Sequence, residues 1–481
     1  MVLALSLLLA SLSSSGCVDA GQGEGRGVLV IAVDGLRADH LSSAGYDRAT
    51  TPNLDRLAEE GVRFEQLLSS APLPVPAHAS LLSGSDPNLA RRRVPQWMAA
   101  KVDQAWSLPE QAPRLAVELG IEGFSTAAFY DHADLAPVVG LDRGFQKYEP
   151  VWDPREADDS PGAERASRFV RQWLLGLSPR DDWFAYVHLS DLDRLWTQVE
   201  YLRDTYFPAR EELDWIPPVG TSDPALFAIP PSRWIGGSFE LGVYEARYDG
   251  ALRRLDERLG LLFDALKRSG RYEDTTICVV GTCGLQFGES GLILDHGRLS
   301  YVDLHVPWIL KPAAGFEFEA GRAVDSLASL IDVAPTLLEL SGVAQPREML
   351  GVSHADSLAG TIETPRERAF ASCGIQGGYA AFDEEWALEV TVPHEAEPGV
   401  VIGWFGELPD QPTPPFELAY RYRDEAYPGL DVSNRAALTG TPRLTELAVA
   451  ARDWIERNEA LRDGFDGLDG FLFEVAEEPA R

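Results

Sequence analysis

The stretch Val28–Gly84, "VLVIAVDGLRADHLSSAGYDRATTPNLDRLAEEGVRFEQLLSSAPLPVPAHASLLSG", decides the fold of this chain of 481 residues. It opens on the apolar run Val28–Val33, which predicts a strand buried on both faces. A polar residue, Asp34, follows directly. A helix is expected between Thr51, as its N-cap, and Gly61, where glycine ends it. The stretch therefore starts a strand–helix alternation.

The same alternation continues along the chain. Further buried strands are expected at Ser125–Tyr130, Trp183–Leu189, Thr275–Gly281 and Val306–Lys311, and longer helices over residues 162–176 and 241–268. Strands that alternate with helices predict an α/β fold, with a central, mostly parallel sheet covered by helices on both faces. Ligands of such sheets bind beyond the carboxyl ends of the strands, which directs attention to Asp34 and to Thr282–Cys283.

The end of the opening stretch, "APLPVPAHASLLSG" at Ala71–Gly84, predicts a loop that enters a helix with Pro76 in its first turn. A helix N-terminus is a favourable place for an anion, because free N–H groups point out of it. Enzymes also place nucleophiles there, but residues 74–77 are Pro, Val, Pro and Ala, which cannot attack a substrate.

The overall charge excludes some partners. The chain has 75 acidic and 42 basic residues, which gives a formal net charge of −33. Such a surface repels nucleic-acid phosphates and anionic lipids. We expect no nucleic-acid partner, and membrane contact only through an N-terminal lipid anchor.

The N-terminus resembles a lipoprotein leader. Residues 1–17 combine an apolar run with small residues before Cys17, the expected site of lipidation, and residues 18–27 form a polar linker. We therefore expect an exported lipoprotein, periplasmic or at the outer membrane or cell surface. The alternative is a buried first helix.

Two domains are expected after the linker, at residues 28–350 and 351–481. The second is a smaller subdomain with a hairpin in "YAAFDEEWALEV" and a last helix over about residues 442–460. Residues 197–240 are interpreted as an insertion over the functional edge of the sheet. Four cysteines in a chain of this length predict no structural disulfide.

Several segments together resemble the sulfatases of the alkaline phosphatase superfamily. Besides the opening stretch, these are "GLDRGFQKYE", "WFAYVHLSDLD", "TTICVVGTCGLQFGES", "LDHGRLSYVDLHVPWIL" and "LIDVAPTLLELSGV", in the order of the family. The resemblance implies a sulfatase/alkaline-phosphatase-like fold with a smaller C-terminal α+β subdomain. It also implies a hydrolase of sulfate or phosphate esters that uses a divalent cation, calcium in sulfatases, to activate a nucleophile.

The resemblance places some family site residues on chemically suitable side chains of this chain. Asp34 takes the position of the first metal ligand, His78 that of the Arg or His after the nucleophile, and His296 that of the final His. The other positions carry different chemistry. The nucleophile position is Pro74, the proton-donating His is replaced by Asp193, and the later metal pair is replaced by Thr282 and Cys283.

These replacements predict a degenerate site. Proline has no hydroxyl or thiol to activate, and one carboxylate, one hydroxyl and one thiol suit neither calcium nor magnesium. We therefore expect no resident cofactor and a sulfatase-like protein that binds an anionic ligand or a protein partner. The alternative is an active sulfuric-ester or phosphoric-ester hydrolase with a rearranged site.

Individual residues keep alternative interpretations. Asp34 is expected either to bind a cation, or else to cap a helix or hydrogen-bond the next loop. His78 and His296 either bind an anion or are kept by packing and hydrogen bonds. Asp34, His78, Cys283 and His296 could together form a zinc set. Cys283 could act as a displaced nucleophile or be inert, and Asp193 as an acid or base or as a surface carboxylate.

Overall fold

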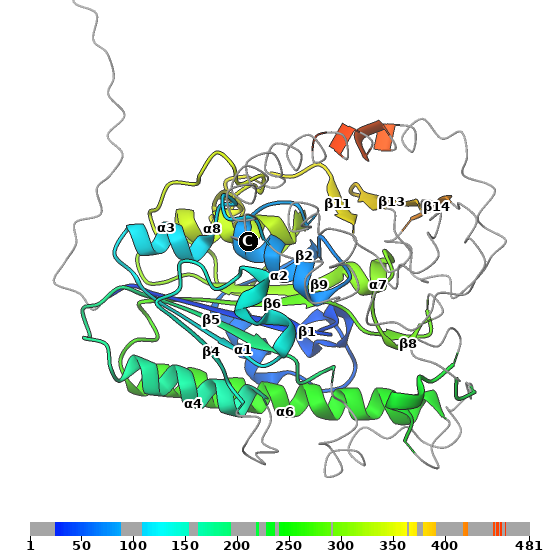
Figure 1. Cartoon of the computed structure of the whole chain (residues 1–481), viewed down its shortest axis with the longest axis horizontal. Coiled ribbons are helices and arrows are strands. Elements are labelled where there is room, and N and C mark those ends of the chain that lie inside the picture. The colour runs from blue at the N-terminus through cyan, green and yellow to red at the C-terminus, as the bar shows by residue number, and fades with distance from the viewer. Residues whose placement is uncertain are drawn as a thin grey trace, which may run out of the picture.

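An eight-stranded sheet forms the centre of the computed structural model (Figure 1). The structure describes residues 25–87, 108–152, 162–193, 218–220, 228–235, 240–289, 292–362, 365–372, 379–390, 417–421 and part of 446–457. In spatial order the strands are β10 (Arg322–Ser329), β2 (Val62–Leu68), β9 (His305–Lys311), β6 (Thr275–Cys283), β1 (Gly27–Asp34), β5 (Trp183–Leu189), β3 (Ser125–Tyr130) and β4 (Lys147–Pro150). The fold predicted from the sequence is confirmed.

Alternate residues of β1 face two separate hydrophobic cores. Leu29, Ile31 and Val33 belong to one core, and Val28, Val30 and Ala32 to the other. A strand buried on both faces carries an unbroken apolar run.

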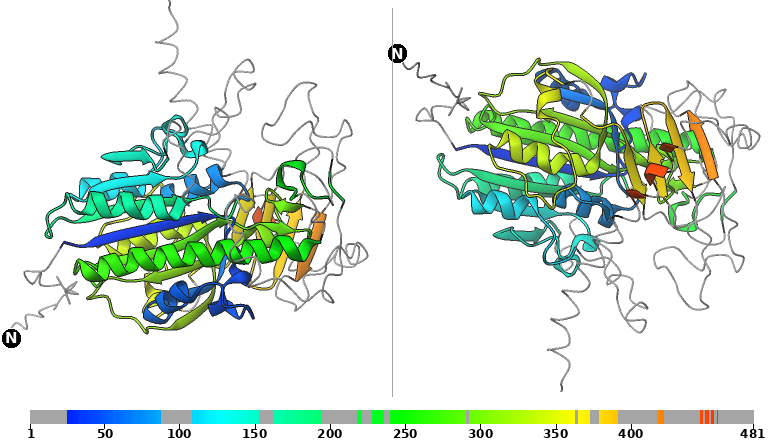
Figure 2. Two further views of the ribbon diagram at one scale, coloured as in Figure 1. Left: turned by 90° about the horizontal axis from the view of Figure 1, so that it is seen from below. Right: turned by 90° about the horizontal axis from the view of Figure 1, so that it is seen from above.

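Helices pack on both faces of the sheet. One layer consists of α1 (Pro52–Glu60), α4 (Gly162–Leu174) and α6 (Leu241–Arg268), and the other of α2 (Pro74–Ser83), α3 (Leu115–Ile121) and α8 (Val333–Leu340). Figure 2 shows the long helix α6 running across one face. Its buried leucines at 252, 255, 259, 262 and 266 recur every three or four residues, as an amphipathic helix requires.

Short elements complete the described part of the chain around the central sheet. They are β7 (Gln286–Phe287), β8 (Ile293–Asp295), α7 (Tyr301–Leu304) and α9 (Ala355–Leu358), with 3₁₀ turns at Ala38–His40, Ser42–Ala44, Ala133–Leu135, Pro137–Val139, Pro231–Arg233 and Leu330–Asp332.

A small antiparallel sheet follows beside the ends of β2 and β10. It consists of β11 (Ala369–Ser372), β12 (Tyr379–Phe382), β13 (Trp386–Val390) and β14 (Glu417–Arg421). The expected hairpin corresponds to β12 and β13, which pair antiparallel. The described residues between 446 and 457 are helical, as expected for the last helix. Most of the expected insertion at 197–240 lies outside the described residues.

Two details go beyond the sequence expectations. Strand β9 runs antiparallel to β6 and β2, while the other pairs of the sheet are parallel, so the sheet is mostly parallel as predicted. The described residues of the link from β6 to β9 form only short elements and no crossover helix, and parallel neighbours need such a crossover. Thr51 precedes α1 as expected, but its side chain makes no capping hydrogen bond.

Candidate functional site

Three parallel strands bring polar residues to one edge of the sheet. Strand β1 lies between β5 and β6, and Asp34 is its last residue. His188 on β5 pairs in register with Ala32, two residues before Asp34. Because side chains two apart on a strand share a face, Asp34 and His188 point to the same side of the sheet.

A β-bulge brings a third residue to Asp34. The register between β1 and β6 passes from Val33↔Gly281 to Asp34↔Cys283, so Thr282 is the extra residue. Bulges re-aim side chains and occur often beside functional sites. Here the hydroxyl of Thr282 donates a hydrogen bond to Asp34 Oδ1 at 2.5 Å.

Helix α2 supplies His78 from above this edge. His78 Nε2 lies 2.9 Å from Asp34 Oδ1, and its Nδ1 is hydrogen-bonded to the hydroxyl of Tyr186 on β5. Its side chain is fully buried. The helix therefore covers the carboxylate instead of leaving it open.

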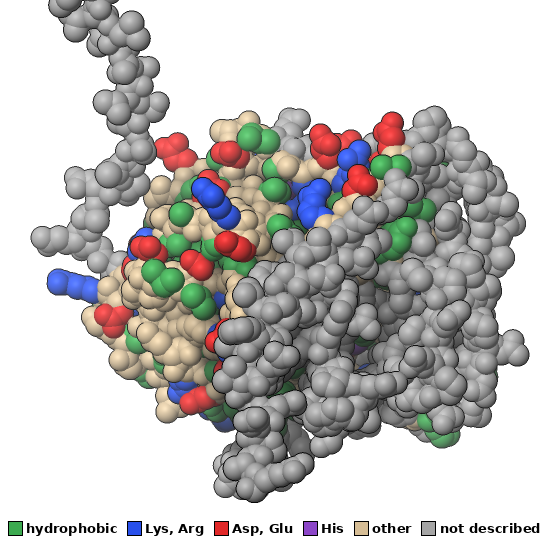
Figure 3. Space-filling model, turned by 45° about the horizontal axis from the view of Figure 1, so that its top comes forward, with side chains coloured by type: hydrophobic (Ala, Val, Ile, Leu, Met, Phe, Trp, Pro, Cys, Tyr) green, Lys and Arg blue, Asp and Glu red, His purple; other side chains and the backbone are tan. Residues whose placement is uncertain are grey.

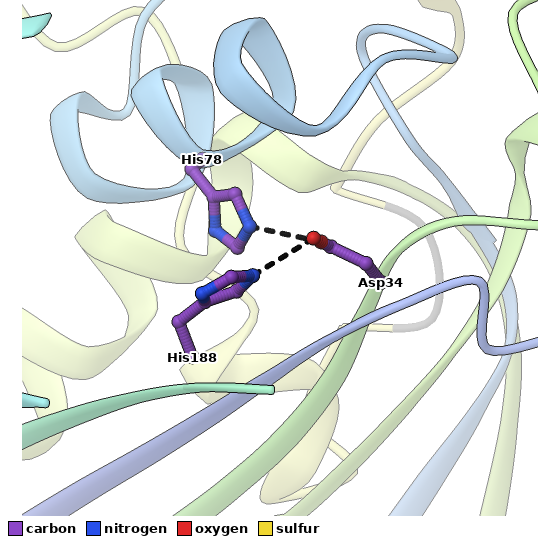
Figure 4. Close-up of side chains that lie close together, drawn as sticks. All are labelled: Asp34, His78 and His188. Carbon is purple, nitrogen blue, oxygen red and sulfur yellow. Dashed lines mark hydrogen bonds and ion pairs between the residues drawn. The ribbon is translucent and has the colours of Figure 1, made fainter. Parts of the chain in front are cut away.

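The ring of His188 has a defined tautomer. Its Nε2 lies 2.8 Å from Asp34 Oδ2, and the backbone N–H of Asp131 donates to its Nδ1 at 3.2 Å. A nitrogen that accepts a hydrogen bond carries no proton, so in the neutral ring the proton is on Nε2. His188 therefore donates to Asp34 (Figure 4). We call Asp34, His78, His188 and Thr282 the Asp34 cluster.

The two histidines set the protonation of Asp34. Burial raises the pKa of this carboxyl, but His188 and His78 outweigh burial and hold it well below its usual value. Burial lowers the pKa of His78, which favours its neutral form. Burial also opposes protonation of His188, but Asp34 raises its pKa overall. The N–H of Asp131 at Nδ1 opposes a second proton on that ring.

Proline opens helix α2 at the expected nucleophile position. Pro74 is the first residue of the helix, and Leu73 before it makes no capping bond. The first backbone bond of the helix runs from the Ala77 N–H to the Leu73 carbonyl. Because Pro74 and Pro76 have no N–H, this helix end has two fewer anion-binding donors than usual.

A second polar group lies next to this edge and contains Asp193, His296 and Asp303, which we call the His296 cluster. His296 Nε2 forms an ion pair with Asp193 Oδ2 at 3.7 Å. Burial opposes protonation of His296, but Asp193 and two further aspartates raise its pKa to about 9. Burial raises the pKa of Asp303 to about 8.

The His296 cluster is incompletely hydrogen-bonded. Among the described residues, His296 Nδ1, Asp193 Oδ1 and Asp303 Oδ1 are buried without a hydrogen-bond partner. The chain reaches His296 through Leu294, whose φ of 57° makes it the one non-glycine residue with positive φ among the described residues. Left-handed backbone at leucine costs about 1–2 kcal/mol, and such strain gathers at functional sites.

Cys283 and Gly35 lie between the two clusters. The N–H of Gly35 hydrogen-bonds the thiol of Cys283, and a Cβ on Gly35 would stand 3.1 Å from Asp193 Oδ1. Burial, Asp34 and Asp193 raise the pKa of Cys283 well above its usual value. A buried, protonated thiol is inert, which argues against Cys283 as a displaced nucleophile. Cys278 and Cys283 are both free, as expected.

The structure brings together Asp34, His78 and Thr282, and separately Asp193 and His296. Asp34 caps no helix in the described ranges, because its carboxylate is hydrogen-bonded to the side chains of His78, His188 and Thr282. Among the described residues, the metal-ligand atoms within 4.8 Å of one another belong to Asp34, His78 and His188. Of the zinc set that the sequence left as an alternative, only Asp34 and His78 belong to this group, together with His188 and without Cys283 and His296.

Sequence reasoning missed His188, Tyr186 and Asp303. His188 had a detectable signal, since it is the one polar residue apart from Tyr186 in the buried strand "WFAYVHL" and stands next to its carboxyl end. Asp303 lies inside the segment "LDHGRLSYVDLHVPWIL" and in a short helix, but it carried no pattern of its own.

Calcium does not fit the donors around Asp34. Calcium takes six to eight oxygen ligands, whereas two of the three side chains bonded to Asp34 present imidazole nitrogen. The Asp/His/His group is chemically closer to a zinc site.

Other predicted features lie elsewhere. Cys17 and the rest of residues 1–24 lie outside the described residues. None of the described helices is both long and apolar enough to cross a membrane. On the face in Figure 3, acidic and basic side chains lie interspersed over the described part.

The comparisons with known proteins agree with this architecture. The sheet and its helix layers define an α/β protein of the alkaline-phosphatase-like class. The Sulfatase family model matches residues 26–343, so the chain belongs to the sulfatase family. The resemblance inferred from the sequence is confirmed.

Sequence relatives include the multifunctional alkaline phosphatase superfamily protein PehA of Trinickia caryophylli, 26% identical over 401 residues, with 69% of this chain and 77% of the relative covered. Human arylsulfatase A is 24% identical over 386 residues, with 71% and 69% covered.

Similar solved structures include a 2-O GAG sulfatase, with a TM-score of 0.64 at 16% identity, covering 91% of this chain and 93% of the other. A phosphonate monoester hydrolase from Silicibacter pomeroyi has a TM-score of 0.61 at 18% identity, covering 90% and 95%. At these identities the likeness shows the fold alone.

Proposed function

We propose that this chain is a catalytically degenerate member of the sulfatase family, an exported lipoprotein anchored through Cys17 that binds a sulfate or phosphate ester, or a protein partner, without hydrolysing it. The observation that carries the proposal is Pro74 at the first position of α2. Its pyrrolidine ring has no atom that can attack sulfur or phosphorus.

The Asp34 cluster supports the same proposal. A cation that activates a nucleophile needs the free oxygens of its carboxylate ligands. Both oxygens of Asp34 already accept hydrogen bonds from side chains of the protein. The two losses are independent, since one lies on a helix and the other at strand ends.

The test is a turnover assay of the purified chain with aryl sulfate, aryl phosphate and aryl phosphonate monoesters, before and after addition of calcium, magnesium, zinc or manganese. We expect rates equal to the buffer background in every case. Pro74→Thr, which returns a hydroxyl, is also expected to stay at background because the cation partners are still replaced. Metal-dependent turnover that disappears in Asp34→Ala would contradict the proposal.

The binding part is tested separately by calorimetric titration with the same esters. Binding of an unhydrolysed ester that His296→Gln weakens would support a ligand-binding role. If none of the esters binds, a protein partner becomes the preferred form of the proposal.

A hydrolase with a rearranged site is the second candidate. It is favoured by the Asp34, His78 and His188 atoms within 4.8 Å of one another, an arrangement of zinc-ligand types. The N–H of Asp131 at His188 Nδ1 speaks against it, because a metal-binding imidazole usually donates from its other nitrogen.

A further inference from the structure

We infer that three hydrogen-bond donors of this chain, from His78, His188 and Thr282, take the place of the divalent cation at Asp34, so that the site is complete without a metal and does not take one up. The inference concerns the cation alone and goes beyond the proposed function. It holds whether or not the chain binds an ester.

The first step concerns the carboxylate. Asp34 is 2% exposed, and its carboxylate lies within hydrogen-bond distance of three side chains. A buried carboxylate needs either a cation or several donors to compensate for lost hydration. Here Oδ1 accepts from Thr282 and faces His78 Nε2, and Oδ2 faces His188 Nε2.

The second step fixes the direction of the His188 hydrogen bond. Asp131 follows β3, next to β5 in the sheet, and its backbone N–H lies 3.2 Å from His188 Nδ1. A backbone N–H can only donate, so Nδ1 accepts and the ring proton is on Nε2, toward Asp34. A metal bound to this Nε2 would require the ring proton on Nδ1. The N–H of Nδ1 would then face the backbone N–H of Asp131, and two donors cannot form a hydrogen bond.

The third step concerns His78. Its Nε2 lies 2.9 Å from Asp34 Oδ1, and because a carboxylate can only accept a hydrogen bond, this nitrogen carries the ring proton. The phenol O–H of Tyr186 that donates to His78 Nδ1 leaves the ring proton on Nε2, which faces Asp34 Oδ1. His78 therefore donates a hydrogen bond to Asp34, as His188 does.

The fourth step concerns Thr282. The bulge in β6 aims its hydroxyl at Asp34, and its carbonyl accepts from the Ser69 hydroxyl on the other side. The threonine is fully buried. The residue at the position of a family metal ligand is thus held as a donor to the remaining carboxylate.

The experiment measures cation binding directly. The full chain is purified without chelator and its metal content determined. Thermal unfolding is then followed after EDTA treatment and after addition of excess Ca²⁺, Mg²⁺ or equimolar Zn²⁺, and absorption is recorded with Co²⁺. We expect less than a tenth of an equivalent of bound metal, the same melting temperature under all conditions, and no Co²⁺ absorption band in the visible range.

A designed variant supplies the positive control. Thr282→Asp replaces the donor by a second carboxylate beside Asp34, and we expect its melting temperature to rise in Ca²⁺ relative to EDTA, unlike that of the unmodified chain. His132→Ala, at a half-buried histidine outside the cluster, serves as the matched control and is expected to behave like the unmodified chain. If Thr282→Asp does not fold, the measurements on the unmodified chain alone decide.

A stoichiometric cation in the unmodified chain that is lost in His188→Ala would overturn the inference, as would a zinc-dependent rise in its melting temperature that requires His78. Such metal binding without ester turnover would leave the proposed function intact. Ester turnover without bound metal would contradict the proposed function and leave this inference intact. The two failures are therefore distinguishable.

Discussion

The Asp34 cluster and the His296 cluster lie on either side of Gly35 and Cys283, yet they differ in how their polar groups are satisfied. In the Asp34 cluster every side chain has a protein partner, and both carboxylate oxygens are bonded. In the His296 cluster three buried polar atoms have no hydrogen-bond partner among the residues that the structure describes. The first is therefore a closed hydrogen-bond network, whereas the second leaves buried polar atoms that the described residues do not satisfy.

The largest expected effect comes from removing the acceptor of the closed network. Asp34→Ala leaves His78, His188 and Thr282 buried without their common partner, and we expect a loss of about 3–5 kcal/mol in the free energy of unfolding. Urea denaturation measures it. The exposed Glu319→Ala is the control and is expected to change stability by less than about 0.5 kcal/mol. A loss below 1 kcal/mol for Asp34→Ala would show that the network does not hold the fold.

The pH dependence distinguishes the clusters next. The raised pKa of His296, about 9, contributes stability that is present below about pH 6.5 and lost as the pH rises to 9. Asp303 acts in the same direction, because a carboxyl pKa raised from 3.8 to about 8 favours the folded state only while the group is protonated. The lowered pKa of Asp34 acts in the opposite sense, and its contribution is lost below about pH 4.

From His296 alone we therefore expect the free energy of unfolding to fall by about 3 kcal/mol between pH 6.5 and 9, and Asp303 adds to this loss up to about pH 8. The measurement is urea denaturation across that range. His296→Gln should flatten the slope, while His132→Ala should leave it unchanged. An unchanged slope in His296→Gln would mean that other groups cause the alkaline loss.

A smaller effect is expected when one donor of the closed network is deleted. Thr282→Val keeps the shape of the side chain and removes one hydrogen bond to an ionised carboxylate, which costs about 1.5–3 kcal/mol. Equilibrium unfolding measures the loss. Because the network is shared, a double-mutant cycle with His188→Ala should show non-additive losses. Additive losses would contradict a single network.

The smallest effect is expected at the residue between the clusters. Cys283→Ala removes one buried thiol and its bond to the Gly35 N–H, and we expect a loss of about 1 kcal/mol with no change in the pH slope. Thermal unfolding at pH 6.5 and 9 tests this. If Cys283→Ala changes the pH dependence of stability, the thiol influences the titration of the clusters on either side of it.

Much of the fold could be predicted from the sequence because local patterns determine it. The apolar run of β1 and the leucine spacing of α6 each indicate their element without reference to distant residues. The direction of β9 could not be predicted in this way, since it depends on whether its connection crosses the sheet.

The site could be predicted only in part, because some of its contacts join residues that are distant in the sequence. Asp34 and His78 were found because both lie in the opening stretch, where the family resemblance is dense. The roles of His188 and Thr282 depend on the register of β5 and on a bulge in β6, which are three-dimensional properties of the assembled sheet. The sequence also could not show that these residues fill the hydrogen-bonding capacity of Asp34.

The order of the strands in the central sheet has a consequence for how the chain is made. Strand β2 is synthesised early, yet both of its neighbours, β9 and β10, come after β6 in the chain, and β1 waits for β5 and β6. Closing such long loops costs entropy, and sheets built from distant strands fold slowly. In a nascent chain that ends before β9, both edges of β2 are unpaired, and unpaired strand edges promote aggregation. The strands that are translated first are thus among the last to be completed, and a truncated chain is expected to fail as a whole.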